Sequence, residues 1–470
     1  MVTSIMHAMT NATDIDGAAN QSAALFITTL ASFLTPFGIS SVNIALPSIG
    51  KAFSVDAILL SWVTTAYLLT SAMFFVPLGK IADIYGRKRL FTCGILTFTL
   101  ASAGCALSNS AVMLIGFRVL QGIGASAIYP IGAAILTSTF PVRELGRVLG
   151  INGTAVYLGF SSGPFLGGLL TQYLGWRSIF LVNVFVGFVL ILLIFRKLKG
   201  EWREAEEEKF DLTGSVLYSL ILFLIMYGFS QLSTMQGLWL ILGGFLGIIL
   251  FIKWEAKTNS PVLEIKLFRN NRIFAFTNLA TLIHSSASFA ITFLLSLYLQ
   301  DVKKLTPESA GLILIAQPVV QALCSPYSGK LSDRIEPRIV ASIGMALTGV
   351  GIGLFTVLDE NTPLPFILGN LILLGFGYGL FSVPNANAVM SSVESRSHGM
   401  ASGMLSTMRI TGTTFSMGIA VLIFSIYLGK VQITPETYPV FLRCIKLAFV
   451  FSAVLCFGGV FASLARGNVR

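Results

Sequence analysis

Three basic side chains lie inside long apolar runs of the sequence and are the residues there most able to do chemistry. Arg118 and Arg409 carry permanent charges, and His284 lies about twelve residues into its run. A charge at the centre of a membrane-spanning helix costs roughly 2.5–3.5 kcal/mol, so it should face an interior partner. An imidazole titrates near pH 6.5 and can exchange a proton at physiological pH. We therefore predict His284 as the proton site, with Arg409 or Arg118 modulating it.

Each of these residues also has an ordinary structural interpretation. His284 can stay neutral in a hydrogen bond between helices, and Arg118, about seven residues into its run, can extend to the end of its helix. No Asp or Glu lies deep in any apolar run, so a boundary carboxylate such as Asp301 is the other candidate proton site. We expect no metal site and no cofactor.

Glycines and charges form two related motifs. Gly79, Asp83, Gly86 and Arg87 lie in the segment 79–89, and its first six residues recur, 250 residues later, with Gly329, Asp333 and Arg334. Glycine permits a tight turn and close approach of helices, and a carboxylate can accept bonds from a helix N-terminus or an arginine. We predict that Asp83 and Arg87 latch the two halves of the protein together on the cytoplasmic side, whereas Lys88 and Arg89 only set topology.

A third motif lies in the apolar run 147–172. It consists of Gly159, Gly163, Pro164, Gly167 and Gly168. Glycines four residues apart lie on one face of a helix, where small residues let another helix approach closely. Close packing without further function is the alternative interpretation.

The composition defines the class of protein to which these residues belong. The chain has 470 residues, of which 54% are hydrophobic and only 11% are charged. Soluble proteins carry about 25% charged residues, so a soluble enzyme and a disordered chain are both excluded. The net charge of +10 reflects basic loops between apolar runs rather than nucleic-acid binding.

The apolar runs are long enough to span a membrane as helices. About 20 apolar residues are needed. We predict fourteen spans, at 23–47, 57–79, 90–108, 111–135, 147–172, 176–195, 212–231, 236–254, 272–299, 306–329, 338–358, 363–390, 399–427 and 440–464. The runs are continuous rather than alternating, which excludes a β-barrel. The five cysteines indicate neither a disulfide framework nor a metal site.

Basic residues predict the orientation of these spans. Of the 31 Lys and Arg, 22 fall in loops on one side and 7 on the other, and the last two are Arg118 and Arg409. Because cytoplasmic loops are enriched in Lys and Arg, both termini should be cytoplasmic. We predict that the segment 1–22 is a cytoplasmic tail and not a signal peptide.

Three landmarks indicate two homologous halves. Besides the recurring motif, Pro130 matches Pro384 at an offset of 254, and 146–150 matches 399–403 at 253. The halves are the six-helix bundles 23–195 and 272–470, separated by a charged linker and a two-helix insertion at 196–271. Parallel repeats place a substrate path between the halves, near mid-membrane.

These motifs resemble those of the major facilitator superfamily. The segment 79–89, the stretch Arg118 to Ala125 and the glycine motif in span five are together similar to the fourteen-span drug:proton antiporter family. The resemblance implies an all-α fold of 6 + 2 + 6 helices and proton transfer involving Arg118. The sequence departs from the family pattern at Gly38, where that family usually has an aspartate. The family's cation specificity and proton coupling therefore do not transfer directly to this chain.

We expect a monomeric, non-enzymatic transporter in the cell membrane that exports a small organic molecule by alternating access, in exchange for protons. An uncoupled facilitator or a metabolite importer of the same fold is the alternative. A channel or an intramembrane enzyme is less compatible with the motifs. The substrate-cavity candidates are Asn43, Tyr67, Tyr129, Tyr157, Gln317 and Asn385.

Overall fold

A computed structural model describes residues 2–203, 209–232, 234–258, 260–263, 265–332, 334–393, 398–429 and 431–467 of the chain. Side chains are not described for residues 2–18, 142, 143, 146, 265–267, 398 and 399. The predicted cytoplasmic tail therefore lies largely outside the described side chains.

The described residues are almost entirely helical and contain no strand. The helices of the first part of the chain are α1 (Val2–Phe53), α2 (Ala57–Tyr85), α3 (Arg87–Ala106), α4 (Ala111–Thr139), α5 (Val142–Leu174), α6 (Arg177–Lys197), α7 (Leu212–Ser230) and α8 (Met235–Glu255). They are followed by α9 (Ile265–Asn270), α10 (Arg272–Ser288), α11 (Ala290–Leu297), η1 (Tyr298–Val302), α12 (Pro307–Leu314), α13 (Ala316–Ser332), α14 (Pro337–Leu354), η2 (Phe355–Val357), α15 (Leu364–Ser391), α16 (His398–Ile423), η4 (Phe424–Leu428), η5 (Pro435–Thr437) and α17 (Tyr438–Ala465).

Thirteen helical segments among the described residues are long and apolar enough to cross a membrane. Helix α5, with 33 residues, lies between the fourth and fifth of these and has undescribed side chains near its start. With α5 the arrangement agrees with the predicted fourteen spans, and the predicted all-α class is confirmed.

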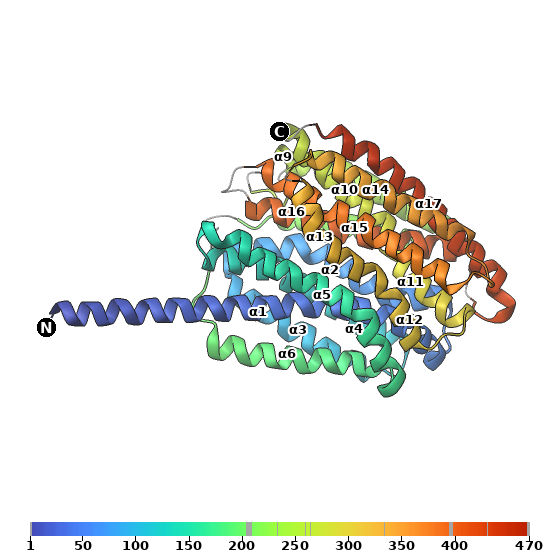
Figure 1. The fold of residues 1–470 in the computed structure, drawn as a ribbon, viewed down its shortest axis with the longest axis horizontal. Coiled ribbons are helices and arrows are strands. Elements are labelled where there is room, and N and C mark those ends of the chain that lie inside the picture. Colours follow the sequence, from blue (N-terminus) through green and yellow to red (C-terminus); the bar gives the residue numbers. More distant parts are fainter. Residues whose placement is uncertain are drawn as a thin grey trace.

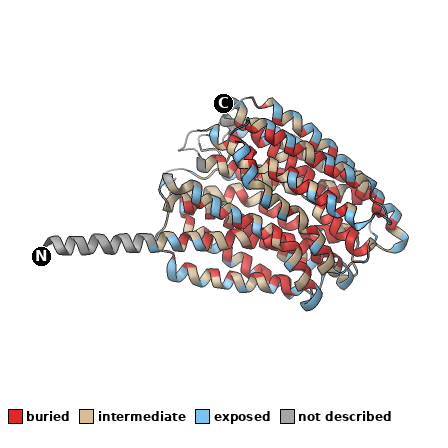
Figure 2. Ribbon diagram, in the orientation of Figure 1, coloured by how far each residue is buried: buried red, intermediate tan, exposed pale blue. Residues whose placement is uncertain are grey.

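The outer surface of the bundle is apolar, as a lipid-facing surface must be. Phe185, Phe195 and Leu181 of α6 are 68%, 70% and 56% exposed, whereas Arg118 inside the protein is fully buried. Figure 2 shows the same distribution, with buried residues concentrated between the helices. This distribution, with polar groups buried and apolar groups exposed, is the reverse of the distribution in a soluble protein.

The helices form two bundles that lie side by side (Figure 1). Helices α1 to α6 pack against one another in the first bundle, and α10 to α17 do so in the second. The described part of α1 begins, and α17 ends, at the end of the molecule where most basic loops lie, which we name the basic end. We name the other end the opposite end.

Helices α7 and α8 form a hairpin that contacts both bundles. Ser219 of α7 donates a hydrogen bond of 2.9 Å to the carbonyl oxygen of Met73 in α2. Ser425, which follows α16, donates one of 3.1 Å to the carbonyl oxygen of Ser230. The inserted pair therefore covers the seam between α2 and α16.

Side-chain caps and one glycine set the helix boundaries. The carboxylate of Asp56 accepts from the Leu59 amide at 2.8 Å, and that of Asp211 accepts from the Gly214 amide at 2.8 Å. Such caps satisfy amides that have no partner within the helix. Gly86 joins α2 to α3 with φ = 122°, a backbone conformation that favours glycine.

Two of the predicted spans are continuous but locally irregular. The span predicted at 272–299 corresponds to Arg272–Val302, and just after Phe289, between α10 and α11, the Ala290 amide donates to Ser416 Oγ at 2.9 Å. The span predicted at 306–329 corresponds to Pro307–Ser332 and is irregular at Ile315, shortly before Pro318, which has no amide hydrogen to continue the ladder. Such irregularities are tolerated in membranes where a neighbour satisfies the backbone.

Candidate functional site

Arg409 of the second bundle meets two tyrosines of the first bundle. It lies about halfway along α16, makes a side-chain hydrogen bond to Tyr157 of α5 and interacts electrostatically with Tyr129 of α4. All three side chains are only half-buried, although they lie well inside their helices. Sequence reasoning selected these residues singly, and the structure brings them together between the bundles.

His284 lies next to this cluster, in the second bundle. Its ring stacks on Phe381 with centroids 4.1 Å apart and planes inclined by 12°, and Tyr378 contacts it edge-on at 5.0 Å. Arg409 acts on it electrostatically. The imidazole is 6% exposed, and its Nε2 atom has no hydrogen-bond partner among the described residues. This nitrogen is therefore a buried polar atom whose hydrogen-bonding capacity is not used by the described residues.

Arg118 is held inside the first bundle and does not extend to a helix end. Its Nε donates to the Val63 carbonyl at 2.8 Å, and Nη1 donates to Gln121 Oε1 at 2.6 Å. The guanidinium carbon lies 4.2 Å from the ring centroid of Tyr67. Nη2 is buried without a partner among the described residues. Arg118 and Tyr67 therefore belong to a second cluster, separate from Arg409.

The other substrate-cavity candidates are engaged in structural hydrogen bonds. Asn43 accepts from Thr64 Oγ1 at 2.9 Å, and Gln317 donates to Gln321 at 3.1 Å. Asn385 donates to Thr281 Oγ1 at 2.8 Å and accepts from Arg466 Nη1 at 3.0 Å. Burial lowers the pKa of Arg466 to about 10, so it stays charged at neutral pH.

The glycine motif of α5 has two packing faces. Gly159 and Gly167 lie against α1, where an added Cβ would come 2.5 Å from the Phe33 carbonyl oxygen and 2.7 Å from Ser41. Gly163, on the same face, packs against Ser40. Pro164 and Gly168 instead contact α12 of the second bundle, at Gly311 and Pro307. The motif thus joins α5 both to its own bundle and to the other one.

The bundles are joined at the opposite end. Ser296 Oγ donates to the Asn43 carbonyl at 2.8 Å, and Gln300 Nε2 donates to the Ile44 carbonyl at 2.8 Å. Gln432 Nε2 donates to the Ser54 carbonyl at 2.7 Å. Hydrogen bonds between described residues of the two bundles lie at this end or at mid-helix.

The motif at the basic end is organised within the first bundle. Arg87 pairs with Asp83 at 2.7 Å and donates to the Ala134 carbonyl of α4 at 3.1 Å. Glu201, in the segment after α6, accepts from the amides of Lys88 at 2.7 Å and Arg89 at 3.3 Å. A Cβ on Gly86 would come 2.7 Å from the Glu201 carboxyl carbon. Sequence reasoning missed Glu201 because it lies in a charged linker.

The repeat of this motif is described only in part. Arg334 is exposed, Gly329 lies near Val383, and Asp333 lies outside the described residues. At Gly79 and Gly403 an added Cβ would meet no atom within 4 Å, although both residues are half-buried. The latch role of this motif therefore stays a prediction.

The position where the resembling family has an aspartate faces the core of the first bundle. A Cβ on Gly38 would come 3.1 Å from Asn183 Nδ2. Asn183 is fully buried, and neither polar atom of its side chain has a partner among the described residues.

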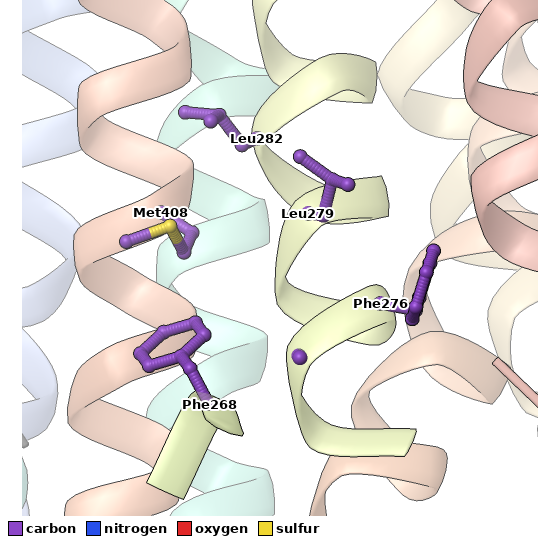
Figure 3. A pocket seen from close by; sticks show the side chains of 6 residues that line it. Phe268, Phe276, Leu279, Leu282 and Met408 are labelled. Carbon is purple, nitrogen blue, oxygen red and sulfur yellow. The ribbon is translucent and has the colours of Figure 1, made fainter. Parts of the chain in front are cut away.

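A pocket of about 270 Å³ elsewhere in the protein is lined by apolar side chains of α9, α10 and α16, including Phe268, Phe276 and Met408 (Figure 3).

Two six-helix bundles, joined at one end and meeting around a polar cluster at mid-helix, are the architecture of a membrane transporter. The family model of the Major Facilitator Superfamily matches residues 28–276 and 277–468. The chain belongs to this superfamily. Among the described residues, no group of three or more His, Cys, Asp and Glu side chains could hold a metal ion.

Relatives of the chain are transport and resistance proteins. It is 29% identical over 396 residues to the riboflavin transporter RibZ of Clostridioides difficile, covering 84% of this chain and 86% of RibZ. It is 32% identical over 408 residues to the multidrug resistance protein Stp of Mycobacterium tuberculosis, covering 85% of this chain and 74% of Stp. A solved structure of a bacterial homologue of the human lysosomal transporter Spinster, inward-facing and occupied, has a TM-score of 0.69 at 14% identity, covering 95% of this chain and 97% of that one.

Proposed function

We propose that the protein exports a small organic molecule across the cell membrane by alternating access, in exchange for protons. The observation that carries this proposal is the cluster of Arg409, Tyr157 and Tyr129, which contains side chains of both bundles at mid-helix. A rocking motion of one bundle against the other would expose such a site to each side of the membrane in turn.

We place the basic end, and with it both termini, in the cytoplasm, because cytoplasmic loops are enriched in Lys and Arg. The seal at the opposite end then closes the protein toward the outside. The empty surroundings of Gly79 and Gly403 near the basic end support a conformation open toward the cytoplasm. We propose that a monomer contains the complete pathway.

We propose His284 as the proton site. It lies beside the inter-bundle cluster, and its Nε2 atom has no partner among the described residues. Arg118 would act indirectly, by supporting the first bundle around Tyr67. An uncoupled carrier or an importer would use the same alternating site without a proton at His284.

Transport by the purified protein in proteoliposomes tests the proposal. Riboflavin and a panel of drugs are supplied on the cytoplasmic face, with and without a pH gradient that is acidic on the other side. We expect at least one compound to accumulate against its own gradient only when the pH gradient is present. Flux that is unchanged when the gradient is dissipated would identify an uncoupled facilitator, and uptake in the reverse direction would identify an importer.

A further inference from the structure

The interior of the described helices carries positive charge without carboxylates. In residues 19–53 of α1 there is no Asp or Glu, and in the other helices each Asp or Glu lies within about one turn of an end. Arg118, His284 and Arg409 lie deeper. Neither arginine has a carboxylate within salt-bridge distance among the described residues, so their charges are not neutralised by the protein there.

Only one of the two arginines is accessible between the bundles. Arg118 is fully buried and is enclosed by Val63, Gln121 and Tyr67. Arg409 is half-buried, makes a side-chain hydrogen bond to Tyr157 and lies near Tyr129, and neither residue is a carboxylate. A guanidinium in a low-dielectric site binds a carboxylate or another oxyanion more strongly than it binds a neutral acceptor.

Aromatic rings surround the same position. The half-buried rings of Tyr129 and Tyr378 lie over the buried rings of Phe75 and His284, with ring centroids 6.1 Å and 5.0 Å apart. The partly exposed tyrosine rings favour planar, conjugated ligands over branched aliphatic ones. A cation placed here would be repelled by Arg409 and would find no carboxylate among the described side chains.

We infer that the inter-bundle site selects planar aromatic organic anions, with Arg409 as the residue that binds the anionic group. The inference rests on the proposed function, because it names the class of molecule that the proposed carrier takes. It departs from the cationic drugs that an aspartate at the position of Gly38 would favour.

Equilibrium binding to the protein in lipid nanodiscs tests this inference without any gradient. The probes are 2-naphthoate, 2-naphthamide and 2-naphthylmethylammonium, which share one ring system but carry a negative, zero and positive charge. Empty nanodiscs correct for partition into lipid. A hydrogen bond to a charged group contributes about 1.5–3 kcal/mol, so naphthoate should bind the wild type about tenfold to a hundredfold more tightly than the other two.

Three variants test whether Arg409 is the residue that causes the preference for naphthoate. Arg409→Gln should reduce the preference for naphthoate to about one, whereas Arg409→Lys should retain most of it because the charge remains. Arg443→Gln is the matched control, since Arg443 lies over Tyr427 at the opposite end and should not affect the preference.

Equal or tighter binding of the ammonium, binding of none of the three probes, or a preference for naphthoate that persists in Arg409→Gln would overturn the inference. If Arg409→Gln does not fold, the wild-type order of affinities and Arg409→Lys still decide the question. Binding of naphthoate without transport of any compound would count against the proposed function and leave the selectivity intact.

Discussion

Gly168 of α5 lies so close to Pro307 of α12 that an added Cβ atom would come 2.5 Å from the Pro307 carbonyl oxygen. Gly311 of α12 makes a similarly close contact with the carbonyl oxygen of Pro164. The two glycines thus let backbone meet backbone across the bundle interface. This contact belongs to the closed opposite end, so it must separate whenever that end opens.

Gly168→Ala should weaken the seal at the opposite end without unfolding the first bundle. The added methyl group cannot fit against Pro307 unless the bundles move apart, and overpacking costs roughly 1–3 kcal/mol. We expect faster labelling of a cysteine introduced at Asn43, measured with a membrane-impermeant maleimide applied from the opposite side.

Gly369→Ala is the control for this variant, because a Cβ there meets no atom within 4 Å. Labelling of the Gly168→Ala protein at the rate of this control would show that the glycine contact does not hold the seal.

Gly163→Leu should destabilise the first bundle itself. Gly163 packs against Ser40 of α1, so a large side chain would force α1 and α5 apart. We expect a lower melting temperature and loss of transport, with Gly163→Ala intermediate in both. The prediction fails if Gly163→Leu melts and transports like the wild type.

Glu201→Ala should destabilise the start of α3. The carboxylate accepts from two amides at the first turn, where no helical partner exists, and losing such a cap costs about 0.5–2 kcal/mol. Hydrogen exchange should rise at Lys88 and Arg89, while Glu360→Gln, an exposed carboxylate at the opposite end, should change nothing. Unchanged exchange in Glu201→Ala would contradict the capping role.

His284→Gln should abolish accumulation driven by a pH gradient and preserve exchange at equilibrium. Glutamine keeps a hydrogen-bonding side chain but cannot titrate, so binding should persist while coupling is lost. The measurement is substrate accumulation in proteoliposomes with an imposed pH gradient. Accumulation at the wild-type level would exclude His284 as the proton site and direct attention to Asp301.

Asp83→Asn should impair transport while the protein still folds. The substitution removes the charge partner of Arg87, which keeps its bond to the Ala134 carbonyl of α4 and can hold the helices in place. We expect slower turnover at matched expression. Wild-type transport rates would show that Asp83 does not latch a conformational state.

The helices and the candidate charges could be predicted from the sequence because both depend on local patterns. Long apolar runs define spans regardless of their neighbours, and Arg118, His284 and Arg409 stand out because charge is costly there. The grouping of Arg409 with Tyr129 and Tyr157 could not be predicted, since it depends on how two bundles far apart in sequence face each other.

Other parts of the site were hidden by composition. Phe381 is one of 37 phenylalanines, and nothing in its sequence context distinguishes the ring that stacks on His284 from rings that face lipid. Glu201 lies in a linker with many charges, where its selective contact with the turn at Gly86 leaves no pattern. The irregular hydrogen bonding after Phe289 depends on Ser416, a residue of another helix.

The positively charged interior has an electrical consequence. A cell interior that is negative relative to the outside expels anions, and each elementary charge that crosses gains about 2.3 kcal/mol per 100 mV. An organic anion bound at Arg409 would therefore leave the cell down the membrane voltage. In the proposed exchange, the exit of the anion and the entry of the proton both follow this voltage, so the voltage would add to the pH gradient in keeping the cytoplasmic concentration of the anion low.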